Sequence, residues 1–407
     1  MRVGRRQLPS GASAILVLAI CAGAAIQLER PVPAPVFHRE LASSYTDPGN
    51  PASLPWPTAG QAALYLTRFG WLGSTASEVS VPIASVTKIM TALVILRTHP
   101  LTVGMSGPTI GVSATAYSIY QSEVAAGDSV VRVEAGETLS EFQLLEGLLL
   151  PSGDNLAVIL ADWQSGSEPA FVQLMNQLAS ALHLTQTHFT DSSGLDTGSV
   201  SSARDLVLLA TVAMKNPVFA AVVAMPSVTL PVAGTVRNYN PILGQYGVIG
   251  IKTGWTSAAM GCLVFAANVT VAGQSVQLIG AVLGQPGGPQ SGLVAAGRVA
   301  TALLAAGAGE LQPLRLPARD TLVGRVTSGW AGQINLQVTR SISLVGAAGA
   351  ELGLRLQLRR RRTPWIRGAE VGSLTVTTPG GFRWQEPVVV TRKLAAPSWW
   401  WRLTRPF

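Results

Sequence analysis

Cysteine, histidine and lysine are scarce in this sequence. Its 407 residues contain two cysteines and four histidines, and only four of the 29 basic residues are lysines. Two cysteines exclude a disulfide framework, and we expect Cys262, which lies in an apolar run, to be a buried thiol. The histidines show neither metal-ligand spacing nor a Ser-His-Asp order, so the sequence predicts no metal site and no cofactor.

Charged residues are also few. They make up 12% of the chain, against 48% apolar residues, which predicts a well-buried globular protein rather than a disordered one. The formal net charge of +8 comes almost wholly from arginine, and no recognised nucleic-acid-binding motif accompanies it. We therefore expect no nucleic-acid partner and favour an anionic membrane or cell wall.

The first 28 residues have the layout of a secretory signal. Three arginines precede an uncharged stretch, residues 7–28, that contains an apolar run. The small residues at 22–25 suit cleavage, but the stretch is also long enough to remain as a membrane anchor, so both outcomes stay open. Residues 29–58 are rich in proline and lack a hydrophobic period, which predicts an extended tether.

Two folded domains and a tail are predicted beyond the tether. Residues 59–308 read as an α/β domain with a strand at 62–66, helices at 85–96, 139–150, 156–163 and 292–306, and a hairpin of 262–270 with 275–283. Residues 311–392 read as a small all-β domain, with alternating segments at 333–338, 353–358 and 373–378. The tail, 393–407, combines three tryptophans with arginines, which favours a lipid headgroup interface.

Ser85 and Lys88 stand three residues apart at the start of a predicted helix. This spacing places both side chains on one helix face, so they can touch. A lysine kept from solvent loses some preference for its charged form and becomes a usable base. The pair thus offers a way to activate a serine nucleophile without histidine.

Lys252, Thr253 and Gly254 form a second candidate site next to a predicted strand. A fixed positive charge and a hydroxyl donor suit a substrate carboxylate, while glycine leaves room for a substrate backbone along a strand edge. Between the two sites, Ser152 begins the segment Ser-Gly-Asp-Asn in the break between two predicted helices. Its hydroxyl could pass protons to a leaving group, or the segment could simply cap a helix.

Taken in order, these three patterns resemble the motifs of penicillin-binding proteins and serine β-lactamases. Longer stretches are similar to the low-molecular-mass D-alanyl-D-alanine carboxypeptidases, namely residues 81–92, 136–139 with 148–153, 187–195, 201–206 and 250–256. The resemblance covers about residues 61–284, and residues 367–376 resemble the family's C-terminal β domain more weakly. It implies an α/β fold of the penicillin-binding, serine β-lactamase-like type, an antiparallel sheet flanked by helices, followed by a small all-β domain.

The resemblance also implies roles for individual residues. Ser85 would be the acylated nucleophile, Lys88 its base and Ser152 a proton shuttle. Lys252 and Thr253 would hold the substrate's terminal carboxylate beside Gly254. The backbone amides of Ser85 and Trp255 would form the oxyanion hole that a tetrahedral intermediate requires.

Two positions depart from the family pattern. Asp154 stands where the family usually has asparagine, so either this carboxylate occupies the slot or a shift by one residue brings Asn155 into it. We expect Asp154 to be the contacting residue and the nearby lysines to hold it ionised. Trp255 occupies a place where the family often has histidine or tyrosine.

The implied enzyme removes the last D-alanine from peptidoglycan stem peptides that end in D-Ala-D-Ala, and β-lactams would acylate it covalently. It would act in the cell envelope, attached by its termini to the outer face of the cytoplasmic membrane. A D,D-endopeptidase, a β-lactamase or a non-catalytic penicillin-binding scaffold are the alternatives. The Glu-x-x-x-Asn loop of one large β-lactamase class is absent from the sequence.

Overall fold

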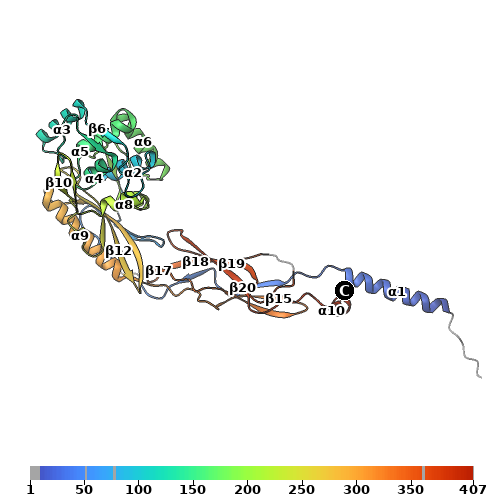
Figure 1. Cartoon of the computed structure of the whole chain (residues 1–407). Coiled ribbons are helices and arrows are strands. Elements are labelled where there is room, and N and C mark those ends of the chain that lie inside the picture. Colours follow the sequence, from blue (N-terminus) through green and yellow to red (C-terminus); the bar gives the residue numbers. More distant parts are fainter. Residues whose placement is uncertain (1–9, 51–52, 77–78, 360–362, 407) are drawn as a thin grey trace, which may run out of the picture.

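The computed structural model describes residues 10–50, 53–76, 79–359 and 363–406. The molecule is elongated: a head of helices around one β-sheet stands at one end, a second sheet forms the middle, and helix α1 extends from the other end (Figure 1). Helix α1 spans Ser10–Glu29, and the short C-terminal helix α10, Trp399–Thr404, contacts it. The arginines at the start of the predicted leader lie outside the described residues.

A five-stranded antiparallel sheet forms the centre of the head. Its order is β11-β12-β13-β3-β4, with bounds Val248–Thr256, Met260–Val271, Gln274–Gln285, Gln61–Leu66 and Gly70–Ser74. The predicted hairpin is confirmed in β12 and β13, whose turn holds Ala272 and Gly273 in the left-handed region, at φ 47° and 79°. Strand β11 lies at the edge of this sheet.

Helices cover both faces of the sheet because alternate residues of each strand point to opposite sides. Ile279 and Ala281 of β13 belong to the core shared with α7, Ala203–Ala213. Leu278 and Val282 belong to the core shared with α9, Pro289–Gly309. The sheet of the head therefore lies between two helical layers.

Helix α2, Lys88–Thr98, lies at the centre of the helical layer. Every residue from Lys88 to Leu96 is buried, which fits a helix enclosed by α4, α5, α6 and α7. The predicted start at 85 is wrong, because a 3₁₀ turn, η1, occupies Ala84–Thr87. The other helices of the layer are α3 Ala114–Ala126, α4 Glu141–Leu149, α5 Asp154–Ser165, α6 Glu168–Ala181 and α8 Pro217–Val223.

A seven-stranded antiparallel sheet, here called the β module, follows the head. Its order is β1-β15-β16-β20-β19-β18-β2, with β15 Leu322–Ser328, β16 Gly332–Val338, β20 Arg383–Val390, β19 Glu370–Thr377 and β18 Glu351–Leu358. Short two-stranded pairs complete the fold: β5 Val81–Pro82 with β8 Val200–Ser201, β6 Thr109–Gly111 with β7 Thr138–Ser140, β9 Ser227–Leu230 with β10 Gly234–Arg237, and β14 Leu311–Pro313 with β17 Val345–Ala347. The all-β character of this region agrees with its alternating sequence.

The segment expected to be a free tether contributes both edge strands of the β module. Strand β1, Val36–Arg39, pairs with β15, and β2, Ser44–Thr46, pairs with β18. The prediction of an extended tether is therefore wrong for these residues. Edge strands of three or four residues are joined to a sheet mainly by backbone hydrogen bonds, which leave no hydrophobic period in the sequence.

The two terminal helices are joined to each other at the end of the molecule opposite the head (Figure 1). The Gln27 side-chain amide donates to the Arg405 carbonyl at 2.7 Å, and the Arg405 guanidinium donates to the carbonyls of Arg30 and Pro31 at 2.7 and 3.0 Å. Among the described residues, one helix is long and apolar enough to cross a membrane, and it is α9, which packs on the sheet. The described part of α1 is a shorter apolar helix.

Candidate active site

Ser85 and Lys88 are in direct contact. The Lys88 ammonium donates a hydrogen bond of 2.8 Å to the Ser85 hydroxyl. Ser85 lies in the η1 turn and is partly exposed, whereas the Lys88 side chain on the first residue of α2 is fully buried. The 3₁₀ turn thus keeps the two side chains together while it leaves only the serine accessible.

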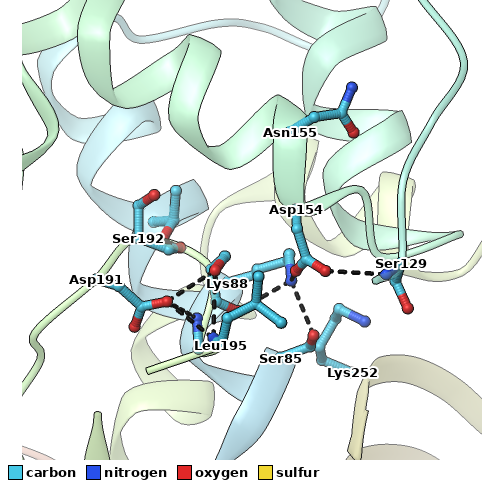
Figure 2. Close-up of polar contacts among 12 residues, drawn as sticks. Ser85, Lys88, Ser129, Asp154, Asn155, Asp191, Ser192, Leu195 and Lys252 are labelled. Atoms are coloured by element: carbon cyan, nitrogen blue, oxygen red, sulfur yellow. Dashed lines mark hydrogen bonds and ion pairs between the residues drawn. The ribbon is translucent and has the colours of Figure 1, made fainter. Parts of the chain in front are cut away.

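Lys88 has two further acceptors around its ammonium group (Figure 2). Asp154 Oδ1 lies 2.5 Å away, and the Ser193 carbonyl accepts at 2.9 Å. An ammonium group has three donors, so Ser85, Asp154 and Ser193 account for all of them. Lys88 is therefore held in one position, and a proton can pass directly between its nitrogen and the Ser85 oxygen.

The Ser193 carbonyl belongs to a turn organised by Asp191. One carboxylate oxygen of Asp191 accepts from the Ser193 hydroxyl at 2.7 Å and from the amides of Gly194 and Leu195 at 2.7 and 2.8 Å. Gly194 has φ +90°, and a Cβ there would lie 1.9 Å from the Ala84 carbonyl oxygen. Glycine at this position thus allows the turn to pack closely against η1. Residues 187–195 resemble the family, but the sequence does not show this contact with Lys88.

Asp154, and not Asn155, faces the two lysines. Asp154 is 1% exposed, and its second carboxylate oxygen accepts from the Ser129 amide at 3.1 Å. Asn155 points away (Figure 2), where it exchanges hydrogen bonds of 3.0 and 2.9 Å with the Val131 backbone. Asn155 therefore fixes the neighbouring segment at Val131. The Asp154 carboxylate lies at the position where the family usually has asparagine.

Burial dominates the charge balance of Asp154. Desolvation raises the pKa of this carboxyl above its ordinary value, and the positive charges of Lys88 and Lys252 only partly oppose that effect. The expectation that the lysines hold Asp154 ionised left out the cost of burying the carboxylate, and it stays a prediction. Asp154 is the first residue of α5, so the positive end of the helix also faces its charge.

Ser152 is held in an uncommon conformation beside this pair. It has φ 69°, in the left-handed region, which is costly for a residue with a side chain. It is 4% exposed, and its hydroxyl has no hydrogen-bond partner within the described residues. A buried hydroxyl without a partner, at the wall of a pocket, is free to bond a ligand.

Strand β11 supplies the opposite wall. A Cβ on Gly254 would lie 2.9 Å from the Ser85 amide nitrogen, so only glycine allows the strand to approach η1 this closely. Lys252 is 1% exposed, and its ammonium donates to the Thr253 carbonyl at 3.0 Å. Burial, reinforced by the charge of Lys88 and opposed by Asp154, lowers the pKa of Lys252 well below its ordinary value.

Trp255 follows the glycine and is tied to the start of α9. Its indole nitrogen donates to the Gly287 carbonyl at 2.9 Å. A Cβ on Gly292, in the first turn of α9, would lie 3.0 Å from the Trp255 ring. The indole is thus fixed by packing and a hydrogen bond, and it forms a rigid part of the rim.

A pocket of about 710 Å³ joins these groups. It is lined by Ser85, Ser152, Asp154, Thr253, Gly254 and Trp255, while Lys88, Lys252 and Asn155 lie behind its surface. Sequence reasoning missed other lining residues, among them Ser129, Tyr239, Gln290 and Leu293. They come from separate segments, and no pattern in the sequence marks them.

Metal-ligand clusters and thiols were the other groups to consider within the described part of the chain. The described residues contain no group of three or more histidine, cysteine or acidic side chains that could hold a metal ion. Cys262 is fully buried, and desolvation raises the pKa of its thiol to about 12. The pocket offers hydroxyls and the carboxyl groups of Asp128 and Asp154, with the two lysines behind its surface.

A lysine-paired serine, a second serine and a Lys-Thr-Gly strand on a helix-covered antiparallel sheet define a protein of the penicillin-binding, serine β-lactamase-like class. The sequence matches the family model for peptidase S11, D-alanyl-D-alanine carboxypeptidase, over residues 72–287. The chain belongs to this family, and the resemblance deduced from its motifs is confirmed.

Individual relatives agree with this assignment. A D-alanyl-D-alanine carboxypeptidase of Streptomyces sp. strain K15 is 37% identical over 230 residues, which cover 52% of this chain and 75% of the relative. DacB2 of Mycobacterium tuberculosis, a D-alanyl-D-alanine carboxypeptidase, is 42% identical over 144 residues, but the match spans only 34% of this chain and 49% of that protein.

Solved structures confirm the fold. The Streptomyces K15 DD-transpeptidase has a TM-score of 0.55 and 30% identity, and the match covers 63% of this chain and 98% of that one. Penicillin-binding protein 5 from Haemophilus influenzae has a TM-score of 0.62 at 21% identity, and covers 85% of this chain and 100% of its own. The similarity to penicillin-binding protein 5 concerns the fold alone. Because it covers 85% of this chain, it extends beyond the head.

Proposed function

We propose that this protein is a serine-type D-Ala-D-Ala carboxypeptidase that removes the terminal D-alanine from peptidoglycan stem pentapeptides through a Ser85 acyl-enzyme. The observation that carries the proposal is the 2.8 Å contact of the buried Lys88 ammonium with the only partly exposed Ser85 hydroxyl, at the wall of the pocket. Membership of the carboxypeptidase family supports the substrate class.

In the proposed acylation, Lys88 acts in its unprotonated form: Ser85 Oγ attacks the carbonyl carbon of the penultimate D-alanine, and the hydroxyl proton passes to the Lys88 amine. The tetrahedral oxyanion would be held by the backbone amides of Ser85 and Trp255, which lie on the two elements that Gly254 brings together. When the intermediate collapses, the C–N bond breaks and the departing D-alanine amine takes a proton. Ser152, whose hydroxyl is unpartnered in the described structure, supplies the relay for that proton.

Thr253 and Lys252 would hold the terminal carboxylate of the peptide. Thr253 lines the pocket, and Lys252 lies behind it, without solvent contact. An incoming carboxylate opposes the desolvation that lowers the pKa of Lys252, so substrate binding favours the ammonium form. Beside them, the edge position of β11 lets the peptide run along the strand.

Acylation of Ser85 by a labelled penicillin tests the proposal. We expect one acyl group per chain on the tryptic peptide that contains Ser85, and no label in Ser85→Ala. A defined pentapeptide should lose one D-alanine at a rate that disappears in the same variant. Label retained in Ser85→Ala would refute the nucleophile, and stoichiometric label without peptide cleavage would indicate a non-catalytic penicillin-binding protein.

Transpeptidation is the second candidate, because the similar K15 structure is that of a DD-transpeptidase. Both reactions share the acyl-enzyme and differ only in whether water or an amine accepts the acyl group. Addition of a D-amino acid or a peptide amine to the pentapeptide assay decides between them. Hydrolysed tetrapeptide should remain the main product, and a majority of amine adduct would favour the transpeptidase.

We also propose that the protein is attached to the outer face of the cytoplasmic membrane by its terminal helices. Apolar side chains of α1, including Ile15, Leu16 and Leu18, are exposed, as are Trp399 and Trp400 of α10. Both helices lie at the end opposite the head, so the β module acts as a spacer (Figure 1). Deletion of 1–28 and 397–407 together should release the protein from lipid vesicles and preserve activity on soluble peptide, and continued sedimentation would contradict the proposal.

A further inference from the structure

A second large pocket lies at the membrane-facing end of the molecule, far from Ser85. Its volume is about 1020 Å³, and residues 31–37 form one wall while the β module and α10 form the other. We call it the terminal groove. Its larger apolar lining side chains are Val32, Val36, Phe37, Trp330 and Trp365. A groove of this size and composition has room for a hydrocarbon chain.

The aromatic walls of the terminal groove are fixed in place. Phe37 stacks on Trp365 with ring centroids 6.1 Å apart, and Trp365 is 1% exposed. Trp330 donates its indole N–H to the Ala395 carbonyl at 2.7 Å and packs edge-on against Trp401 of α10. The groove therefore exists before any ligand enters, so little ordering opposes binding.

One end of the groove carries positive charge. Arg402 of α10 lines it, and its buried Nε has no hydrogen-bond partner among the residues described. Arg405 follows one helical turn later, where desolvation and then the charges of Arg30 and Arg402 lower its pKa. A buried guanidinium nitrogen without a partner, in a cluster of three arginines, favours an anionic ligand, and phosphate fits its fork of donors.

The terminal groove is also continuous with the proposed membrane anchor. Residues 31–37 directly follow α1, and Arg402 lies on the same helix as the exposed Trp399 and Trp400. An apolar groove beside these helices would meet acyl chains and headgroups together. The groove thus combines apolar walls, a guanidinium donor suited to phosphate and a position next to the proposed anchor. These are the features of a site for a lipid with a phosphate headgroup.

We propose that the terminal groove binds one phospholipid molecule, with an acyl chain between its aromatic walls and the phosphate at Arg402. This inference rests on the proposed membrane attachment, and it adds a defined lipid site to what the terminal helices do alone. Such a site would fix how the β module stands on the membrane and so where the pocket of the head faces.

Native mass spectrometry of the full chain in detergent tests the site, with phosphatidylglycerol as the probe. Diacylglycerol, which lacks phosphate, and glycerol 3-phosphate, which lacks acyl chains, separate the two halves of the recognition. We expect one phosphatidylglycerol retained per chain and neither of the other two. Arg402→Gln should lower retention about tenfold, because the charge-assisted hydrogen bond is lost.

Two further variants control the result. Arg355→Gln removes the same charge from an exposed position of β18 and should retain the lipid like wild type. Ala34→Trp adds bulk inside the groove and should abolish retention, while unchanged peptide cleavage shows that each variant is folded. Equal retention by Arg402→Gln and Arg355→Gln, full retention by Ala34→Trp, or equal retention of diacylglycerol would each overturn the proposal.

Flotation with phosphatidylglycerol vesicles separates this inference from the attachment itself. A wild-type chain that floats with vesicles but retains no lipid in detergent refutes the groove and leaves the attachment in place. A chain that retains one lipid but does not float refutes the attachment and supports the groove.

Discussion

Replacement of Asp154 by asparagine is the sharpest test of the site. The carboxylate lies 2.5 Å from the Lys88 ammonium, and both side chains are almost fully buried, at 1% and 0% exposure. Asparagine keeps an oxygen acceptor for Lys88 and removes only the negative charge. The variant also restores the amide that the family usually has at this position.

Two effects of different size follow from the geometry. Loss of one charged partner from a hydrogen bond between charged groups costs about 1.5–3 kcal/mol of stability, less than the 3–5 kcal/mol for leaving a buried charge with no partner. Burial raises the pKa of Asp154, so the wild-type carboxyl takes up a proton, and loses its ion pair with Lys88, at a higher pH than an ordinary aspartate. Asparagine cannot take up this proton, so the acid limb of the acylation profile should shift to lower pH in the variant.

The assay is the rate of penicillin acylation between pH 5 and 9, measured beside urea unfolding. Asn155→Ala is the matched control, because Asn155 bonds only to the Val131 backbone and points away from the lysines. It should lose stability and leave the acid limb in place. An acid limb unchanged in Asp154→Asn would refute the coupling of Asp154 to the base, and negligible effects of both variants would remove the whole segment beyond Ser152 from the mechanism.

Two further predictions concern a close approach and a buried carboxyl. Gly254→Ala places a Cβ 2.9 Å from the Ser85 amide and should slow acylation about a hundredfold by displacing the nucleophile, whereas Gly111→Ala, which meets nothing within 4 Å, should be silent. Equal acylation by the two would show that the approach does not position Ser85. Burial raises the pKa of Glu141 to about 7 from 4.5, so its proton is retained in the folded state while the unfolded chain loses it, and the free energy of unfolding falls as pH rises through that window. Glu141→Gln cannot ionise, so urea unfolding should show it more stable than wild type at pH 8, by about 1–3 kcal/mol, with little difference at pH 4; an advantage equal at both values would contradict the assignment.

Local spacing in the sequence determined the parts of this protein that depend on neighbours along the chain. A spacing of three residues from Ser85 to Lys88 is enough to bring the side chains together, whether the turn is α or 3₁₀. The strand-like stretches 262–270 and 275–283, joined through Ala272-Gly273, likewise predicted the hairpin of β12 and β13. These features are short-range, and each depends on side-chain types that can be read directly from the sequence.

The tertiary structure alone decided the groups that surround the pair. The Ser193 carbonyl on Lys88 and the Ser129 amide on Asp154 are backbone atoms, which every residue carries, so the sequence does not mark them. The same reason hid β1 and β2, since edge strands of the β module pair through their backbones. The charge balance of Asp154 depended on burial by distant segments, because desolvation is a property of the folded interior and not of any one residue.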